Sequence, residues 1–485
     1  MNYKMLFRLS GQVLLLESAF LFLPFIVSLI YGENASAAAF AESLLIALLI
    51  GLFLVFVLSK GAKGGFFARE GLVATGLCWL IMSAFGAIPF VLNGDIPSYV
   101  DAFFEMASGF TTTGASIIHN VEEMTHGTLF WRNFSNWIGG MGVLVFLLAV
   151  LPGSGKETGF TLHILRAESP GPSVGKIVPR MKQTAIILYF LYIVLTILNI
   201  IFLVAGGMPV FDSVCHAMGT AGTGGFGVKA DSFASYSPYI QNVTTVFMLL
   251  FGVNFSIYYI IILKKLGQVF RDEEVRLYVL TVLAAGLLIG TNIRFLYSSW
   301  EETLRTSFFQ VASMITTTGF ATADFDTWPV FSKTLILLLM MIGACAGSTG
   351  GGMKCARVLI LVKSLLRNIR KTIHPRTVHV LKINDRVISE DVIANTQAYF
   401  SAYVIIVAVL TVLLSLDGFS IETNLSAALC TFNNIGPGLD KVGPTCNFAA
   451  YSDLSKIFLS LAMITGRLEI FPILSLFNRS TWKKI

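Results

Sequence analysis

Long uninterrupted apolar stretches recur along this chain and restrict its fold more than any other feature. Each has about the length that an α-helix needs to cross a bilayer, which is roughly 20 residues. Ten such stretches lie near residues 11–31, 38–60, 71–93, 130–152, 183–206, 238–263, 277–296, 329–362, 393–416 and 455–477. Apolar and polar residues do not alternate along them, which argues against an outer-membrane barrel. Only 13% of the residues are charged, against roughly 25% in soluble domains, so the sequence predicts an all-α polytopic membrane protein.

Lysine and arginine indicate which side of the membrane each loop faces, because cytoplasmic loops are enriched in both. With a cytoplasmic N-terminus and ten crossings, the cytoplasmic segments hold 26 of the 34 Lys and Arg residues. These segments are residues 1–10, 60–70, 153–182, 264–276, 354–390 and 478–485. We therefore expect both termini in the cytoplasm. The net charge of +6 follows this topology and does not indicate nucleic acid binding.

The N-terminal stretch could also be a signal peptide, since Ala35-Ser36-Ala37 is similar to a signal-peptidase site. The apolar run over residues 11–30 is longer than the usual hydrophobic core of such a peptide, which is about 7–15 residues. We therefore favour a retained first helix.

Four shorter, half-apolar segments lie between successive spans, near residues 99–113, 210–224, 302–318 and 421–435. Each is too short to cross the membrane and ends in a polar, glycine-containing stretch. Such a segment can enter the membrane and return where protein or a water-filled cavity satisfies its backbone. The charge distribution places all four on the outer face, so they are candidate re-entrant loops.

The ends of these four segments form a repeat. Thr111-Thr112-Thr113-Gly114 recurs almost unchanged as Thr316-Thr317-Thr318-Gly319. Aligned on their last glycine, the four ends read Thr112-Thr113-Gly114, Thr223-Gly224-Gly225, Thr317-Thr318-Gly319 and Asn434-Ile435-Gly436. The pair Gly224-Gly225 leaves the register of the second stretch open by one residue. Four repeated units of span, re-entrant helix, glycine stretch and span can close around a central pore.

Glycine and threonine in these stretches suit a site for a dehydrated cation. Rings of backbone carbonyls replace the water shell of such an ion. Turning successive carbonyls towards one axis needs backbone angles that glycine adopts most readily. The re-entrant helices would also direct the partly negative ends of their dipoles at the ion. The stretches contain no acidic residue, so they do not indicate a filter for divalent cations.

On these residues the chain resembles the TrkH/KtrB potassium-uptake family within the Trk/Ktr/HKT superfamily. The resemblance also rests on a glycine-rich break at 343–352, on Glu168-Ser169-Pro170-Gly171-Pro172 and on Gly466-Arg467-Leu468-Glu469. An extra pair of helices before the four units, over about residues 1–60, is similar to TrkH rather than KtrB. The resemblance implies that Gly114, Gly225, Gly319 and Gly436 shape the turns of a K⁺ filter. Carbonyls of the filter would come from Thr112, Thr113, Thr223, Gly224, Thr317, Thr318, Asn434 and Ile435.

Two further features resemble gating elements of that family. Gly343, Gly347, Ser348, Thr349, Gly350, Gly351 and Gly352 would form an intramembrane gating loop, although close helix packing also explains small residues in a membrane. Arg467 lies about midway along an apolar run, where a charge normally faces a cavity or a partner. The resemblance implies that Arg467 lines the pore below the filter; a buried ion pair with a carboxylate is the alternative.

The resemblance implies a non-enzymatic function, namely uptake of K⁺ across the bacterial cytoplasmic membrane as the pore-forming subunit of a Trk-type system. Rb⁺ and, weakly, Na⁺ would share the pathway, and no organic cofactor is expected. It also implies a homodimer controlled by a cytosolic nucleotide-binding ring similar to TrkA. The alternative is a K⁺ symporter coupled to H⁺ or Na⁺. The expected divisions are an N-terminal helix pair (1–68), pore unit 1 (69–154), a cytoplasmic linker (155–182), and pore units 2 (183–265), 3 (266–372) and 4 (373–485).

Overall fold

The computed structural model describes residues 1–60, 68–142, 181–377 and 379–482, and most of the predicted linker at 155–182, including its Glu168–Pro172 motif, lies outside them. The described chain is helical except for one short hairpin, in which β1 (Lys382–Ile383) pairs antiparallel with β2 (Arg386–Val387). Six of its helices are long and apolar enough to cross a membrane, or seven if one bent pair counts as a span. The predicted polytopic all-α class is confirmed.

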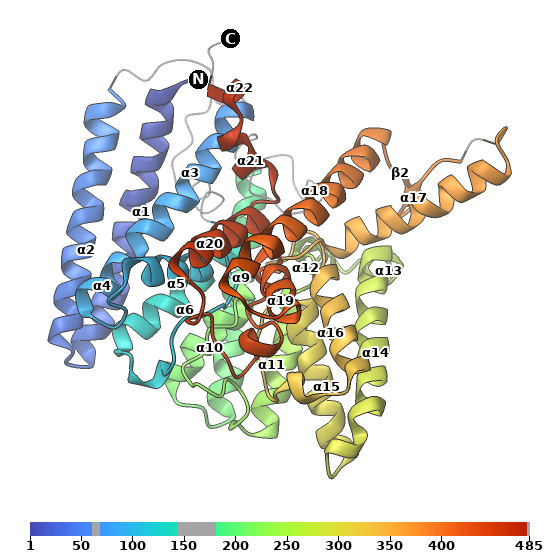
Figure 1. Cartoon of the computed structure of the whole chain (residues 1–485), viewed down its shortest axis with the longest axis horizontal. Helices are drawn as coiled ribbons and strands as arrows, with labels where there is room; N and C mark the ends of the chain where they lie inside the picture. The colour runs from blue at the N-terminus through green and yellow to red at the C-terminus, as the bar shows by residue number, and fades with distance from the viewer. Residues whose placement is uncertain (61–67, 143–180, 378, 483–485) are drawn as a thin grey trace.

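The N-terminal helix pair consists of α1 (Tyr3–Ile30) and α2 (Asn34–Phe53), and α2 continues as a π-helical turn, η1 (Leu54–Leu58). The two helices lie side by side (Figure 1). Their backbones meet where glycines face each other, because a Cβ on Gly51 would lie 3.1 Å from the carbonyl oxygen of Gly11. Small residues at such crossings allow membrane helices to pack closely.

Four units follow the helix pair, and each contains one largely buried helix of 12 to 16 residues, called its short helix below. Unit 1 comprises α3 (Ala68–Gly86), α4 (Ile88–Asn93), the short helix α5 (Tyr99–Phe110), η2 (Val121–Glu123) and α6 (His126–Met141). Unit 2 comprises α9 (Met181–Ala205), the short helix α10 (Val210–Gly222), α11 (Pro238–Phe251) and α12 (Phe255–Ile262). Unit 3 comprises α13 (Leu266–Arg271), α14 (Glu273–Ile293), η3 (Arg294–Leu296), the short helix α15 (Trp300–Ile315), η4 (Phe325–Thr327), α16 (Val330–Ile342) and α17 (Cys355–Ile373). Unit 4 comprises β1, β2, α18 (Glu390–Leu414), η5 (Ser415–Asp417), the short helix α19 (Ile421–Phe432), η6 (Asp440–Val442), α20 (Asp453–Arg467), α21 (Phe471–Phe477) and α22 (Arg479–Trp482).

The short helices begin where the sequence supplies caps and negative charge. In three of them a serine hydroxyl before the first turn accepts a backbone N–H of that turn, and these serines are Ser98, Ser299 and Ser420. All four carry an acidic residue in the first turn, where the positive end of the helix dipole favours it. The first helical turn therefore fixes where each short helix begins.

Breaks interrupt several of the helices that follow the short ones. The predicted span at 238–263 is bent by 91° between α11 and α12, and the one at 455–477 is interrupted between α20 and α21, where Glu469 and Ile470 have positive φ. Neither is the single straight span that its apolar run suggested. The predicted glycine-rich break is present, because residues 343–354 separate α16 from α17. Part of the predicted span at 130–152 lies outside the described residues.

The two ends of the chain lie at the same end of the bundle (Figure 1). Tyr3 donates to the carbonyl oxygen of Trp482 over 3.4 Å, and the two rings stack with centroids 6.4 Å apart. The expectation that both termini face the cytoplasm stays a prediction.

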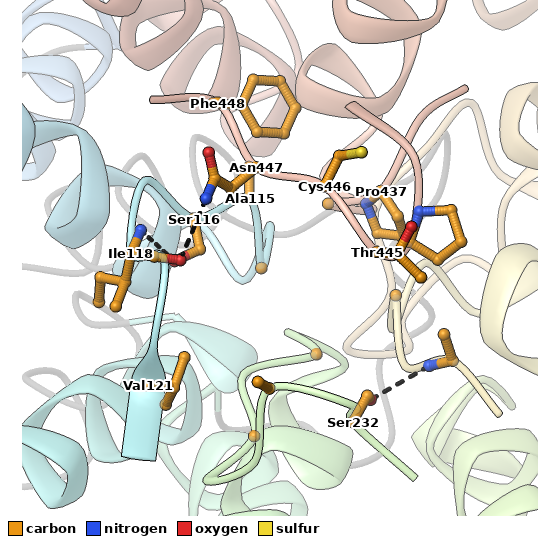
Figure 2. Close-up of a pocket in the computed structure, with 18 of the residues that line it drawn as sticks. Ala115, Ser116, Ile118, Val121, Ser232, Pro437, Thr445, Cys446, Asn447 and Phe448 are labelled. Carbon is orange, nitrogen blue, oxygen red and sulfur yellow. Dashed lines mark hydrogen bonds between the residues drawn. The ribbon is translucent and has the colours of Figure 1, made fainter. Parts of the chain in front are cut away.

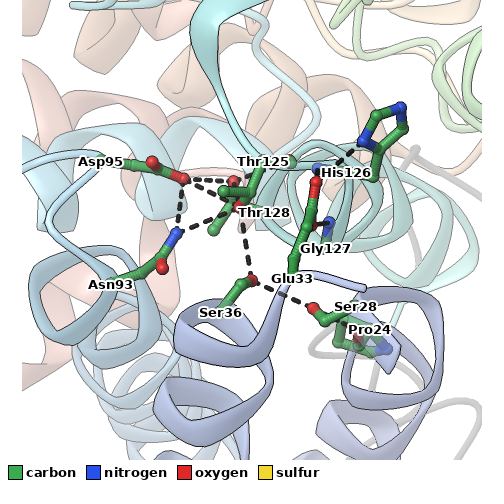
Figure 3. Close-up of polar contacts among 10 residues, drawn as sticks. All are labelled: Pro24, Ser28, Glu33, Ser36, Asn93, Asp95, Thr125, His126, Gly127 and Thr128. Carbon is green, nitrogen blue, oxygen red and sulfur yellow. Dashed lines mark hydrogen bonds and ion pairs between the residues drawn. The ribbon is translucent and has the colours of Figure 1, made fainter. Parts of the chain in front are cut away.

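A network of polar contacts fixes the helix pair to unit 1 (Figure 3). Glu33, in the connection between α1 and α2, accepts the backbone N–H groups of His126 (2.8 Å) and Gly127 (3.2 Å) at the start of α6. The same carboxylate lies 2.8 Å from Nδ1 of His126, whose ring stacks on Tyr31. Ser36 joins the network through a hydrogen bond from Thr125. The extra helices therefore attach directly to the first unit.

Candidate functional site

Each of the four short helices ends in a three-residue turn, and the four turns have the same backbone conformation. We call them the glycine turns; they are residues 112–114, 223–225, 317–319 and 434–436. The first residue of each turn is left-handed although it is not glycine, with φ values of 55° at Thr112, 54° at Thr223, 58° at Thr317 and 58° at Asn434. The last residue of each is a glycine with φ between 71° and 98°. Thr223 therefore matches Thr112, and the register of the second turn, left open by the sequence, ends at Gly225.

One hydrogen-bond pattern closes each short helix. The N–H of the middle residue of each turn reaches a carbonyl five residues back, over 2.8 Å from Thr113 to Ser108 and 2.9 Å from Ile435 to Cys430. Gly224 and Thr318 make the same bond to Gly219 and Ser313, both over 2.8 Å. This pattern usually has glycine at the left-handed position. A β-branched threonine there is a genuine outlier, and such strain costs of order 1 kcal/mol or more per residue.

The turns leave their carbonyl oxygens without hydrogen-bond donors. Within the part of the chain that the structure describes, no backbone or side-chain donor bonds to the carbonyls of the first two residues of any turn. These residues are Thr112, Thr113, Thr223, Gly224, Thr317, Thr318, Asn434 and Ile435. Buried carbonyls without donors are uncommon, and each needs an explanation. A bound cation is one such explanation.

The four glycines show that the turns form a closed ring. A Cβ on Gly114 would point at the carbonyl oxygen of Gly224 in the second turn. In the same way Gly225 faces Thr318, Gly319 faces Ile435, and Gly436 faces Thr113 of the first turn, completing the circle. All four separations are under 3.0 Å, which real Cβ atoms essentially never show. Only glycine therefore lets the turns approach one another this closely.

A cavity of about 190 Å³ opens on one side of the ring. All four last glycines line it, and segments from all four units surround it (Figure 2). Asn447 and Phe448 of unit 4 lie beside Ser116 of unit 1, and the N–H of Phe448 donates to the carbonyl of Ser116 over 2.9 Å. The cavity therefore borders the last residue of each glycine turn.

The glycine-rich loop at 343–354 lies against the ring and against unit 2. The N–H of Gly351 donates to the hydroxyl of Thr317 over 2.6 Å, so loop and ring touch directly. Thr349 donates to the carbonyl of Phe251 over 3.2 Å, and the N–H of Cys345 donates to the carbonyl of Gly252 over 3.0 Å. The loop therefore occupies the break between α11 and α12.

Arg467 connects this loop to two other units. It is the last residue of α20, at a break rather than midway along a straight helix. Its guanidinium donates to the carbonyls of Thr349 (2.7 Å), Gly139 (2.5 Å) and Gly140 (2.6 Å). Because the helix ends here, helical geometry does not fix the direction of Glu469, and that carboxylate forms an ion pair with Arg357.

Sequence reasoning missed three charged residues around the site. Lys354 is buried and left-handed, and it donates to the carbonyl of Gly350 in the loop. Glu105 and Arg132 form a buried ion pair behind the first glycine turn. The available signal was a charge within an apolar or half-apolar segment, which often marks a functional position. Glu105 and Arg132 carry that signal in the printed sequence.

Comparisons with known proteins agree with one another along nearly the whole chain. The model of the TrkH family, described as cation transport protein, matches residues 37–484. The Trk system potassium uptake protein TrkH of Salmonella typhimurium is 35% identical over 494 residues, which cover 100% of both chains. The Trk system potassium uptake protein TrkG of Escherichia coli is 31% identical over 98% of both chains. Among solved structures, that of the potassium transporter TrkH from Vibrio parahaemolyticus matches with a TM-score of 0.87 and 31% identity, covering 100% of each chain.

Proposed function

The chain belongs to the TrkH family of cation transport proteins, and we propose that it is the pore-forming subunit of a Trk-type system that takes up potassium. Membership in a family of transporters confirms the expectation that the protein is not an enzyme. Its relatives are named as potassium uptake proteins, which supports K⁺ as the transported ion. We further propose that it works in the bacterial cytoplasmic membrane.

The closed ring of glycine turns is the observation that carries this proposal. Eight carbonyl oxygens from four units have no donor among the described residues, and the turns that hold them close into one circle. Carbonyl rings of this kind replace the hydration shell of a monovalent cation. The ion pathway would run from the cavity of about 190 Å³ through the ring to the loop at 343–354. Thr112, Thr113, Thr223, Gly224, Thr317, Thr318, Asn434 and Ile435 would supply the oxygens, with Gly114, Gly225, Gly319 and Gly436 shaping the turns.

Control of the pathway would lie in the loop and Arg467. Residues Gly343, Gly347, Ser348, Thr349, Gly350, Gly351 and Gly352 would block the inner side of the ring until the loop moves. Arg467 holds a carbonyl of that loop together with two carbonyls of α6, so it links the loop to another unit. Its fixed positive charge would also oppose cation passage. A homodimer and a cytosolic nucleotide-binding ring similar to TrkA belong to the same proposal.

Ion flux into liposomes that contain only this protein tests the function. We expect rubidium to enter along a K⁺ gradient, with slower sodium entry and with no requirement for a proton gradient. Uptake that stops when a protonophore removes the proton gradient would favour the coupled symporter instead. Absence of any rubidium flux from well-folded, correctly inserted protein would overturn the pore proposal.

A further inference from the structure

A buried ion pair stands behind the first two glycine turns. Nε of Arg132, on α6, lies 2.6 Å from Oε1 of Glu105, on α5. Glu105 has no exposed surface and Arg132 is 3% exposed. Removing two charges from water is unfavourable unless further hydrogen bonds satisfy them. The remaining contacts of the two side chains therefore indicate which parts of the backbone the pair positions.

Glu105 binds the segment that leaves the first turn. Its Oε2 accepts the backbone N–H of Ile117 over 3.1 Å, and its Oε1 accepts the hydroxyl of Ser116 over 3.0 Å. These residues follow Gly114 closely. The carboxylate on the short helix thus holds the chain just beyond the turn that the same helix ends in.

Arg132 binds the corresponding segment of the second turn. Its Nη1 donates to the carbonyl of Gly227 over 3.1 Å. Its guanidinium carbon lies 3.5 Å from the ring centroid of Phe226, a distance suited to a cation–π contact. Phe226 and Gly227 directly follow Gly225. A single ion pair therefore fixes the outer ends of two neighbouring turns relative to each other.

The other three units have no charged residue at the position of Glu105. Counting seven residues back from the first residue of each turn gives Glu105, His216, Gln310 and Ala427, all fully buried. Gln310 on the third short helix also binds the segment that follows its own turn, because its amide donates to the carbonyl of Ala323 over 3.3 Å. In the described chain, the ionic version of this support occurs only in unit 1.

The ion pair also sets the net charge beside the cavity that the four glycines line. Arg132 lines the cavity together with the four glycines. A cation that enters the cavity would meet the full field of the guanidinium if the carboxylate did not neutralise it. Charges in a partly buried site interact far more strongly than they do in water.

We propose that Glu105 and Arg132 are a positioning pair for the potassium filter, which holds the first two turns in register and keeps the entrance electrically neutral. The inference rests on the proposed function. It assigns two separable properties to Glu105. The length of its side chain, here called its reach, positions the turns, and its negative charge neutralises Arg132.

Two substitutions separate these properties in proteoliposomes. Glu105→Gln keeps the reach and removes the charge, so the external K⁺ concentration for half-maximal uptake should rise roughly tenfold, as expected for an unneutralised nearby charge. Glu105→Asp keeps the charge and shortens the reach, so the preference for Rb⁺ over Na⁺ should fall while half-saturation changes little. The double variant Glu105→Gln/Arg132→Gln removes both charges and should bring half-saturation most of the way back.

The control is Glu123→Gln, which removes an exposed carboxylate from the same unit and should leave both quantities unchanged. Half-saturation in Glu105→Gln equal to that of the wild type would overturn the neutralising role. A double variant as impaired as the single one would indicate simple loss of packing and would also overturn it. If Glu105→Gln does not insert, Glu105→Asp still decides, because an unaltered ion preference there contradicts the positioning role. Absence of flux in the wild type would instead refute the proposed function.

Discussion

Gly319 and Ile435 approach each other so closely that a methyl group on Gly319 would overlap the carbonyl oxygen of Ile435. This is the tightest of the four contacts around the ring; at Gly436 the separation from the carbonyl oxygen of Thr113 is 2.8 Å. We predict that Gly319→Ala displaces the fourth turn. This variant should lose most of its rubidium uptake and most of the preference for rubidium over sodium.

Gly207→Ala is the matched control for that substitution. Gly207 has a φ of +86° against +87° at Gly319, but nothing lies within 4 Å of its Cβ position. Both variants should lose about 1–2 kcal/mol of stability from the strained backbone angle, and only Gly319→Ala should change ion flux. Equal effects of the two variants on selectivity would show that backbone strain, not contact between turns, controls the ring.

The hydroxyl of Thr317 should hold the glycine-rich loop against the ring. Thr317→Val removes the acceptor of the Gly351 N–H, a bond of 2.6 Å, and a lost hydrogen bond is worth about 1 kcal/mol. We expect basal rubidium flux to rise about fivefold, since that energy would no longer favour the seated loop. Thr112→Val is the comparison, because the hydroxyl of Thr112 has no hydrogen-bond partner within the described residues. A similar rise in both variants would contradict a role specific to the loop.

Arg467 should restrain flux through its three carbonyl contacts. Arg467→Ala removes both the contacts and the charge, so rubidium uptake at equal expression should increase severalfold. Arg467→Lys retains the charge without the planar fork of donors, and its flux should lie between those of Arg467→Ala and the wild type. Uptake that is the same in all three proteins would show that Arg467 does not limit conduction.

Asp440 should make the segment that follows the fourth glycine turn sensitive to acid. Hydrogen bonds from Thr423 and Ser420 hold the pKa of Asp440 below its ordinary value, which is about 3.9. A lowered folded-state pKa gives stability that is present above the unfolded-state pKa and is lost as pH falls through the folded-state pKa. Melting temperature should therefore drop below about pH 4 in the wild type, with a shallower drop in Asp440→Asn. Parallel melting curves over that range would exclude this contribution.

Glu33 should stabilise the attachment of the N-terminal helix pair. Glu33→Ala removes a carboxylate that accepts two N–H groups at the start of α6 (Figure 3), a capping contact worth about 1 kcal/mol. We expect a lower melting temperature, and a mass tag or protease should reach the connection between α1 and α2 more readily. Unchanged protection of that connection would mean that the packing of α1 against α2 and α3 suffices.

Several parts of the architecture were predictable because they depend on local patterns. The recurrence of Thr112-Thr113-Gly114 as Thr317-Thr318-Gly319 located two of the four turns, and the glycine-rich stretch located the break after α16. The break at Asn254 was harder to see, since one asparagine that caps α12 interrupts an otherwise apolar run. At Glu469 the chain turns through left-handed angles that a non-glycine sequence does not indicate.

Contacts between residues far apart in the sequence were beyond local patterns. Glu105 and Arg132 are 27 residues apart, and nothing in their surroundings in the sequence indicates that they meet. The carbonyl partners of Arg467 lie on two other units, and backbone carbonyls are present at every residue, so they leave no trace in the sequence. Assignment of the filter and the loop to ion conduction stays a proposal, as do the exact unit boundaries.

The ring also restricts the order in which this protein can reach its native state. Asn434 of the fourth turn donates to the hydroxyl of Thr113 of the first turn across 321 residues of sequence. Contacts between such distant residues form late, because the intervening chain must first be ordered. Because the chain is made from its N-terminus, the segments of the first three turns leave the ribosome before the segment of the fourth. A chain that ends before Asn434 therefore lacks the contact that joins the fourth turn to the first.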